Sequence, residues 1–240
     1  MAGDFYEEHA QDYADKNETA PYNALYERPA SLALLGDVRG KRVLDAGCGP
    51  GAHALGLLER GAIVTGCDRS EPELAIAGER LGPGVQLDRV DLATSLPYAS
   101  GRFDAVLCSL VLHYLEDWST PLREFHRVLR PEGRLVVSTH HPIADYGLSG
   151  TDDYFATELW HDTWTVGGRP VPTSYYRRPL AAMTDAFLDA GFSIERVTEP
   201  APATAMRTRF PEAFRRLSTA PAFLFFRLRP AGLEGACRRT

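Results

Sequence analysis

The chain has 240 residues, of which 44% are hydrophobic and 24% charged, and its formal net charge at pH 7 is −6. This composition is ordinary for a soluble globular protein and excludes fibrous and disordered classes. An acidic chain has no overall attraction for phosphate backbones or anionic lipid, so nucleic acid and membranes are not expected partners. The sequence has no apolar run of the ~20 residues that a membrane span needs and no secretory signal at its start, so we expect a cytoplasmic protein.

Length and cysteine spacing predict the domain organisation. Domains usually contain about 100–200 residues, so this length predicts a single domain with an elaboration. The cysteines have no paired spacing, which favours buried thiols in a reducing compartment over a disulfide frame or a zinc site. They are Cys48, Cys67, Cys108 and Cys237.

The first predicted elements are helices. Tyr6, Ala10 and Tyr13 are spaced i, i+4 and i+7 within residues 4–16, which predicts an amphipathic helix. A second helical stretch runs from about Tyr22 to Leu35 and ends at Gly36, a residue type that is common after helix C-termini.

From residue 41 onward, apolar strand-like segments alternate with helical ones. The predicted strands are Lys41–Ala46, Ala62–Cys67, Val85–Val90, Phe103–Ser109 and Arg134–Thr139. Helices are predicted from Ala52, from Ser70 and from Pro121, and Ser70 with Glu73 predicts a capping box. This alternation predicts an α/β fold with a doubly wound, mostly parallel sheet that helices cover on both faces.

The alternation breaks at residue 140. Residues 140–178 are rich in Tyr, Trp, His and Asp and show no helical period. Glu158–Val166 and Arg169–Arg177 flank a Gly-Gly pair, which predicts a β-hairpin. The alternation then resumes with predicted elements at Leu180–Ala190, Ser193–Glu199, Pro211–Leu217 and Phe223–Leu228.

A glycine-rich loop, Val43-Leu-Asp-Ala-Gly-Cys-Gly-Pro-Gly51, is the most informative motif. It follows a strand and opens a helix, where glycines let the backbone approach a ligand and the helix N-terminus offers free N–H groups. The spacing G-x-G-x-G differs from the dinucleotide motif G-x-G-x-x-G, and no phosphate-loop Gly-Lys-Ser/Thr is present. A tight turn between strand and helix can also use glycines, so the loop alone does not specify a ligand.

Two aspartates make the ligand more specific. Asp68 ends the second predicted strand, about 20 residues after Gly47, where a carboxylate can accept both hydroxyls of a ribose. Asp91 lies just past the third strand, where it could accept a bond from an adenine amino group. Either one alone would fit a turn or helix cap, but both in this order predict a nucleoside site.

Several motifs together resemble those of class I S-adenosylmethionine-dependent methyltransferases of methyltransferase type 11. These are the small-molecule branch typified by ubiquinone and menaquinone methyltransferases. The motifs are Val43–Gly51, Gly66–Ser70, Val90–Leu92, Phe103–Tyr114 and Leu129–Gly133. The resemblance implies a Rossmann-like, seven-stranded sheet with an antiparallel last strand, N-terminal lid helices and a small hairpin cap. It divides a single domain, 1–240, into lid helices (1–36), core (37–139 and 179–230) and cap insert (140–178).

The resemblance also implies S-adenosyl-L-methionine as cofactor and assigns residues to it. The glycines would hold the methionine moiety, Asp68 the ribose, Asp91 and Leu92 the adenine edge, and Tyr13 would close over the cofactor as a lid. The implied cofactor-binding residues are Tyr13, Asp45, Gly47, Gly49, Asp68, Arg69, Asp91, Leu92 and Ser109.

Methyl transfer needs a base only when the accepting atom carries a proton that must leave. The candidates are His140 and His141, just beyond the fifth predicted strand, and His113 after the fourth. Each could instead be a turn or core residue bonded to the backbone. No metal is expected, because adjacent histidines on a strand point to opposite faces and chelate one ion poorly.

The aromatic insert provides the substrate candidates Tyr154, Trp160, Trp164 and Tyr176. An aromatic, partly polar cap suits a flat or apolar small molecule, although a hairpin could also pack its own aromatics or form a dimer interface. We therefore expect methyl transfer to an O, N or C atom of a small aromatic metabolite, by a monomer or homodimer.

Three other functions fit parts of the sequence. A nicotinamide-dependent oxidoreductase would use a similar sheet, but the glycine spacing and the two aspartates count against it. A catalytically silent relative would keep the cofactor site without activity. A methyltransferase acting on RNA or protein is supported by residues 207–240 alone, which hold eight arginines and two acids.

Overall fold

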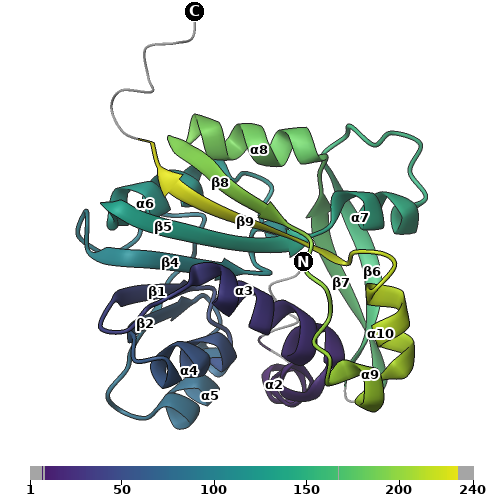
Figure 1. The fold of residues 1–240 in the computed structure, drawn as a ribbon, viewed down its shortest axis with the longest axis horizontal. Helices are drawn as coiled ribbons and strands as arrows, with labels where there is room; N and C mark the ends of the chain where they lie inside the picture. Colours follow the sequence, from purple (N-terminus) through teal and green to yellow (C-terminus); the bar gives the residue numbers. More distant parts are fainter. Residues whose placement is uncertain (1–6, 8, 167, 232–240) are drawn as a thin grey trace, which may run out of the picture.

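The computed structural model describes residues 7, 9–166 and 168–231. Cys237, Tyr6 and most of the first half of the helix expected over 4–16 lie outside them. Seven strands form one sheet in the order β3-β2-β1-β4-β5-β9-β8 (Figure 1). They are β1 (Arg42–Ala46), β2 (Ile63–Asp68), β3 (Gln86–Arg89), β4 (Phe103–Ser109), β5 (Leu129–His140), β8 (Phe192–Thr198) and β9 (Phe223–Pro230).

The sheet is parallel except at its last strand. β1 pairs in parallel with β2 and β4, and β4 pairs in parallel with β5. β9 runs antiparallel to both neighbours, β5 and β8. The predicted Rossmann-like α/β sheet with an antiparallel final strand is therefore confirmed.

Helices cover both faces of the sheet (Figure 1). One layer contains α3 (Arg28–Leu35), α4 (Ala52–Glu59) and α5 (Glu71–Leu81), and the other contains α6 (Ser119–Val128) and α8 (Leu180–Asp189). Successive strand residues point to opposite faces, so neighbours such as Phe225 and Phe226 enter different cores. Phe225 packs in the cluster with Leu35 and Leu57, whereas Phe226 packs in the cluster with Phe125 and Phe187.

The N-terminal segment lies against the edge of the sheet where the parallel strands end. It contains α2 (Ala10–Thr19) and one turn of π-helix, η1 (Asn23–Glu27), that leads directly into α3. The predicted continuous helix from Tyr22 is therefore interrupted by a π-turn, a feature found frequently at functional sites. Gly36 ends α3 with a φ of 77°, as the sequence predicted.

The insert forms the predicted hairpin, which is a separate two-stranded sheet of β6 (Glu158–Val166) and β7 (Arg169–Arg177). Lys16 of α2 donates to the Thr165 carbonyl at 2.7 Å, so the first helix is bonded to the hairpin. The short helices α9 (Met206–Arg209) and α10 (Pro211–Leu217) pack against η1, because Met206 and Leu217 share a buried cluster with Tyr26.

The structure corrects the expectation that residues 140–178 contain no helix. α7 (Pro142–Ser149) begins at the N-cap residue His141, has proline in its first turn and ends at Gly150, where φ is 67°. These are ordinary helix start and stop signals, but two turns are too short for a clear apolar period. β5 also begins earlier than predicted, because Leu129 pairs with Phe103 ahead of a register shift.

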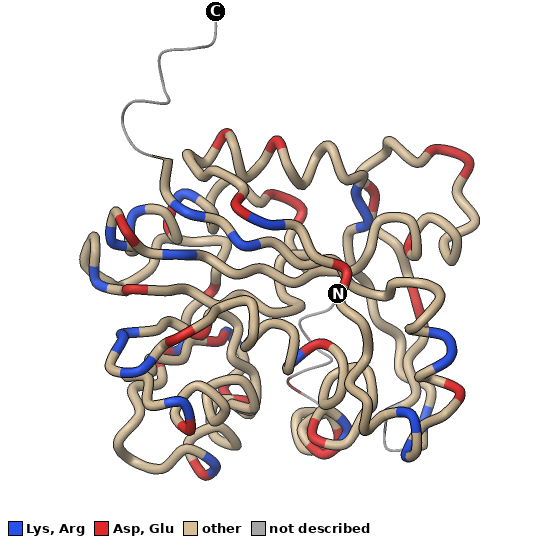
Figure 2. Tube along the Cα trace, viewed as in Figure 1, with Lys and Arg blue, Asp and Glu red and all other residues tan. Residues whose placement is uncertain are grey.

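Charged residues of both signs are intermixed along the described chain, and three cysteines are buried in it. Figure 2 shows basic and acidic residues intermixed along the described trace. Within that part of the chain, no helix is both long and apolar enough to cross a membrane. Cys48, Cys67 and Cys108 are buried thiols, as predicted, whereas Cys237 lies outside the residues described.

Candidate functional site

A cavity of about 520 Å³ lies where the carboxyl ends of β1, β2 and β4 meet α2 and the hairpin. Its volume is within the range of small-molecule sites, about 300–1,000 Å³. Most of the residues that the sequence assigned to a cofactor line it, namely Tyr13, Gly47, Gly49, Asp68, Arg69, Asp91, Leu92 and Ser109. Asp45 is buried behind the loop and does not line the cavity.

The glycine loop turns sharply at the end of β1. Gly47 and Gly49 have φ values of 76° and 50°, which lie in the left-handed region that favours glycine. A Cβ on Gly47 would meet a Val111 methyl at 2.3 Å, so no side chain fits there. The amides of Gly47 and Cys48 both donate to the Cys67 carbonyl, which holds the loop beside the end of β2.

Asp68 is positioned by backbone donors. Its carboxylate accepts from the Gly49 amide at 2.9 Å and from the Ser70 amide at 3.0 Å. Burial raises the pKa of Asp68, and these amides counteract that effect. Asp91 accepts from the Ala93 amide at 2.9 Å and lines the same side of the cavity. The two carboxyl groups thus share one end of the cavity, as a nucleoside site requires.

Glu73 is an additional acid that the sequence did not assign to this site. Ser70 Oγ accepts from the Glu73 amide at 3.4 Å, but the reciprocal half of the predicted capping box is absent because Asp68 accepts from the Ser70 amide. The Glu73 side chain is buried, lines the cavity, and neither carboxyl oxygen has a hydrogen-bond partner. Burial, with a smaller contribution from Asp68, raises the pKa of Glu73 to about 9.

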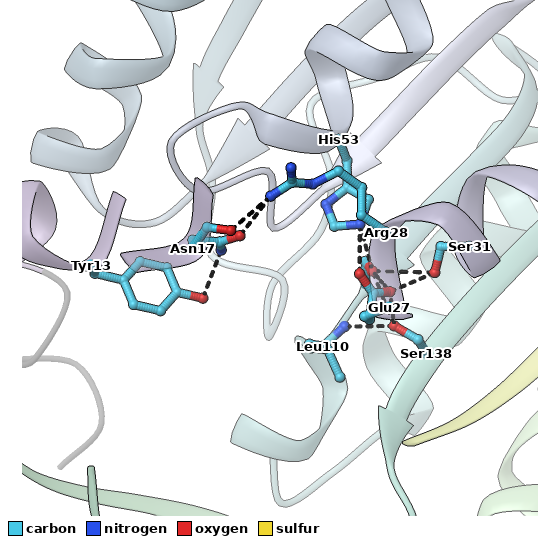
Figure 3. A network of polar contacts seen from close by, with 9 residues as sticks. Tyr13, Asn17, Glu27, Arg28, Ser31, His53, Leu110 and Ser138 are labelled. Atoms are coloured by element: carbon cyan, nitrogen blue, oxygen red, sulfur yellow. Dashed lines mark hydrogen bonds and ion pairs between the residues drawn. The ribbon is translucent and has the colours of Figure 1, made fainter. Parts of the chain in front are cut away.

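Glu27 is the centre of a polar network at the cavity floor (Figure 3). One carboxylate oxygen accepts from the hydroxyls of Ser31, Ser109 and Ser138, and the other is 2.8 Å from His53 Nε2. The network joins the π-turn to the carboxyl ends of β4 and β5. Sequence reasoning assigned Ser109 to the site but missed Glu27, His53 and Ser138.

The charges in this network follow from its geometry. Burial disfavours ionisation of Glu27, but His53 and the serine hydroxyls outweigh it and lower the pKa of Glu27 to about 2. Burial alone would lower the pKa of His53, but the Glu27 carboxylate outweighs this effect and raises it, which favours a carboxylate–imidazolium pair. Ser109 and Glu27 contact the same nitrogen of His53. This differs from a nucleophilic triad, in which the serine and the acid contact opposite nitrogens.

A second chain of contacts connects α2 to the segment that carries Glu27. Figure 3 shows Arg28 donating to the backbone and side-chain oxygens of Asn17, and Asn17 donating to the Tyr13 hydroxyl at 3.2 Å. Tyr13 lines the cavity and also packs with Trp164 and Val171 of the hairpin. The α2 helix is therefore bonded to Arg28, next to Glu27, and also packs against the hairpin.

The three histidines predicted as bases do not line the cavity. His141 caps α7 by accepting from the Ile143 amide, and its other nitrogen is 2.8 Å from Glu199. His113 is buried, has no partner on either nitrogen, and stacks on His140 at 4.1 Å between ring centroids. Burial lowers the pKa of His113 well below its ordinary value, so it is neutral. None of the three therefore lies in the cavity lining, and a catalytic role for them stays a prediction.

Three of the four predicted substrate aromatics lie on the hairpin, on opposite faces, and Tyr154 precedes it. Tyr176 lines the cavity, whereas Tyr154, Trp160 and Trp164 do not. Trp160 packs edge-on against Tyr175 instead. The hairpin face toward the cavity contains the cross-strand pairs Leu159–Tyr176 and His161–Ser174.

The residues present fit S-adenosylmethionine. A Cβ on Gly47 or Gly49 would meet Val111 or Glu73, so both positions need glycine. Asp68, Glu73 and Asp91 line the cavity, and the Glu73 carboxyl group has no partner. A cavity lined by several acids also suits a ligand that carries a sulfonium charge.

Comparison with known proteins also indicates a methyltransferase. The model of the methyltransferase domain family matches residues 44–137. An uncharacterized protein from Haemophilus influenzae is 31% identical over 229 residues, covering 86% of this chain and 88% of that one. A crystal structure of an S-adenosylmethionine-dependent methyltransferase from Mesorhizobium loti superposes with a TM-score of 0.68 at 31% identity, covering 89% of this chain and 99% of that one.

A ubiquinone biosynthesis O-methyltransferase from Pseudomonas aeruginosa is 38% identical over 106 residues, or 42% of this chain. The match spans 44% of that relative, less than half of its length. The identity over nearly the whole Mesorhizobium protein, with the family match and the cavity geometry, shows that this chain belongs to the S-adenosylmethionine-dependent methyltransferases.

Proposed function

We propose that this methyltransferase acts on a small aromatic acceptor held between the end of β4 and the hairpin. The observation that carries this proposal is that the cavity lining also contains aromatic and aliphatic side chains that the cofactor assignment does not use. They are Tyr114, Leu115, Leu159 and Tyr176, which we call the wall of the cavity. Such a lining suits a flat, apolar ligand with few polar groups. The O-methyltransferase activity in the name of the Pseudomonas relative points the same way.

The assignment of residues to the cofactor is part of the proposal. Bound S-adenosylmethionine supplies an electrophilic methyl group, which an acceptor atom displaces in line. Asp68 would hold the ribose hydroxyls, and Asp91 with the Leu92 amide would bind the adenine edge. Gly47 and Gly49 would expose their backbone to the methionine moiety.

The remaining task of the protein is alignment and exclusion of water. Leu110 lines the cavity with a φ of 55°, and its amide is bonded to the Ser138 carbonyl at 3.0 Å and hydroxyl at 3.1 Å. It is the non-glycine residue with positive φ among those described, and backbone strain of this kind clusters at functional sites. Tyr13 on α2 and the hairpin would close the cavity from the other side. Because these two segments would enclose a ligand that the sheet binds, we divide the domain into lid (1–36), core (37–139 and 179–230) and cap (140–178).

A labelling experiment tests the acceptor class. The protein is incubated with S-adenosylmethionine carrying a deuterated methyl group and, in parallel, with pooled aromatic metabolites, total RNA or total protein. We expect label in the small-molecule pool, with Asp68→Ala as the inactive control. Label confined to RNA or protein would refute the proposal, and the intermixing of basic and acidic residues along the described trace argues against RNA (Figure 2).

A further inference from the structure

The hairpin carries a histidine that the cofactor site does not use. His161 and Ser174 are cross-strand partners on the face toward the cavity, and both line it. His161 Nδ1 is 2.7 Å from Ser174 Oγ, so one ring nitrogen is held by a hydroxyl. With Nδ1–H donating to Ser174, the lone pair of Nε2 is available to a ligand.

Two histidines line the cavity within the part of the chain that the structure describes, and their surroundings differ. The Nε2 atom of His53 lies 2.8 Å from the buried Glu27 carboxylate and 3.2 Å from Ser109 Oγ, so this nitrogen is already engaged within the protein. His161 has a neutral serine as its partner and is exposed toward the cavity mouth. Of the two, His161 is the one that can act as a proton acceptor.

The other groups around His161 indicate what it would meet. The residues that line the cavity with His161 include the apolar side chains Leu115 and Leu159 of the same wall as Tyr176. The tyrosines that line the cavity with His161 are Tyr13 on α2, Tyr114 after β4 and Tyr176 on β7. Tyr176 donates to Glu116 at 3.2 Å, so its hydroxyl is engaged. A wall without a fixed charge accepts a neutral aromatic ligand, and a histidine in that wall suits a ligand with a hydroxyl group.

We propose that His161, oriented by Ser174, is the general base of the reaction and that the acceptor is a phenol. This inference rests on the proposed function and specifies the acceptor within it. Phenols of ordinary acidity, with a pKa of about 10, are mostly protonated at neutral pH, so removal of the proton assists attack. The phenol oxygen forms the new bond to the methyl carbon, the carbon–sulfur bond breaks with its electron pair left on sulfur, and the proton moves to Nε2. From His161 the proton reaches solvent through the cavity mouth.

The probe for the test is 4-nitrocatechol, because its colour changes when its hydroxyl group ionises. Its spectrum is titrated against pH with the protein and S-adenosylhomocysteine, and its methylation is followed separately. In wild-type protein we expect the bound probe to ionise at lower pH than the free probe. His161→Gln should lose this shift. With unsubstituted catechol, a phenol of ordinary acidity, as the acceptor, His161→Gln should also lose about 100-fold or more in methylation rate at neutral pH. The two rates should converge at alkaline pH, where catechol ionises unaided.

Controls separate a base from a structural residue. Thr163→Ala changes the next position on the same hairpin face, outside the cavity lining, and should behave as wild type. Added imidazole should restore part of the rate to His161→Ala but not to Gly47→Leu. Ser174→Ala should give a smaller loss than His161→Gln.

Each result decides between the claims. If wild-type protein binds S-adenosylhomocysteine in a calorimeter but neither binds nor methylates 4-nitrocatechol, the phenol assignment is wrong and the methyltransferase assignment stands. If His161→Gln keeps the wild-type spectrum and pH–rate profile, His161 is not the base. If S-adenosylhomocysteine does not bind at all, the proposed function itself fails.

Discussion

The unpartnered carboxyl group of Glu73 gives a prediction about stability that needs no knowledge of the acceptor. The side chain is 1% exposed, and neither oxygen has a partner. Its pKa is raised from 4.5 to about 9, mainly by burial and further by Asp68. Between these two values the folded protein holds a proton on Glu73 that the unfolded chain has released. Folding therefore becomes less favourable as pH rises through this window.

The magnitude follows from the two pKa values. Each pH unit between about 5 and 9 should remove about 1.4 kcal/mol from the free energy of unfolding through this group. At pH 7.5 the accumulated penalty is about 4 kcal/mol relative to a side chain that does not titrate. Glu73→Met has a similar length, fills irregular space and carries no charge, so it should be more stable than wild type by an amount of that order.

Urea unfolding of the cofactor-free protein at several pH values provides the assay. The stability difference between Glu73→Met and wild type should grow with pH by about 1.4 kcal/mol per unit up to about pH 9. Glu73→Gln should show the same pH trend with a smaller gain, because its amide stays unpaired. Glu79→Gln, an exposed position on the same helix, is the matched control. A difference that is constant from pH 5 to pH 9 would refute the argument.

Three other variants test the site and its floor. Asp68→Ala should weaken S-adenosylhomocysteine binding by about 3 kcal/mol, roughly a hundredfold in Kd by calorimetry, and an unchanged Kd would remove Asp68 from the ribose site. Gly47→Ala should abolish that binding, since its Cβ would meet Val111 at 2.3 Å, whereas Gly101→Ala, which also has a positive φ but no atom within 4 Å of its Cβ, should not. Glu27→Gln should cost about 3–5 kcal/mol of stability because His53 loses its buried partner. Since the pKa of His53 is raised, this cost should be full below about pH 6.5 and shrink at higher pH, and a pH-independent cost would contradict the ion pair.

Local patterns were sufficient to predict the sheet and the cofactor end of the cavity. The glycine loop, Asp68 and Asp91 each follow a strand directly, and parallel strands bring their carboxyl ends to one edge whatever the rest of the chain does. The hairpin could also be predicted locally, because a Gly-Gly pair between two β-rich segments favours a tight turn that pairs them.

The hairpin's orientation was not readable in this way. Residues alternate between faces along a strand, so Trp160 and Trp164 share one face and Leu159 and His161 the other. Composition favoured the tryptophans as substrate contacts, but the choice of face depends on packing against Tyr175 and Tyr13. The alternation could have shown that only one of the two sets, the tryptophans or Leu159 and His161, can face the cavity. It could not show which set does so.

The polar floor depends on contacts between distant segments. Glu27 meets Ser109 and Ser138 across 82 and 111 positions of the sequence, through a π-turn that has no clear sequence signature. In the sequence, a glutamate between Tyr26 and Arg28 resembles an ordinary surface residue of a helix. Its burial depends on tertiary contacts with the sheet. By contrast, His141 stands directly before a proline, and that helix-start signal could have identified it as a cap.

A crystal structure of the protein with S-adenosylhomocysteine tests the central claim most directly. The account predicts ribose hydroxyls bonded to Asp68, adenine beside Asp91, and the sulfur facing the hairpin wall that contains His161 and Tyr176. Adenine against the hairpin, or a sulfur that points away from it, would contradict both the cofactor assignment and the acceptor site built on it.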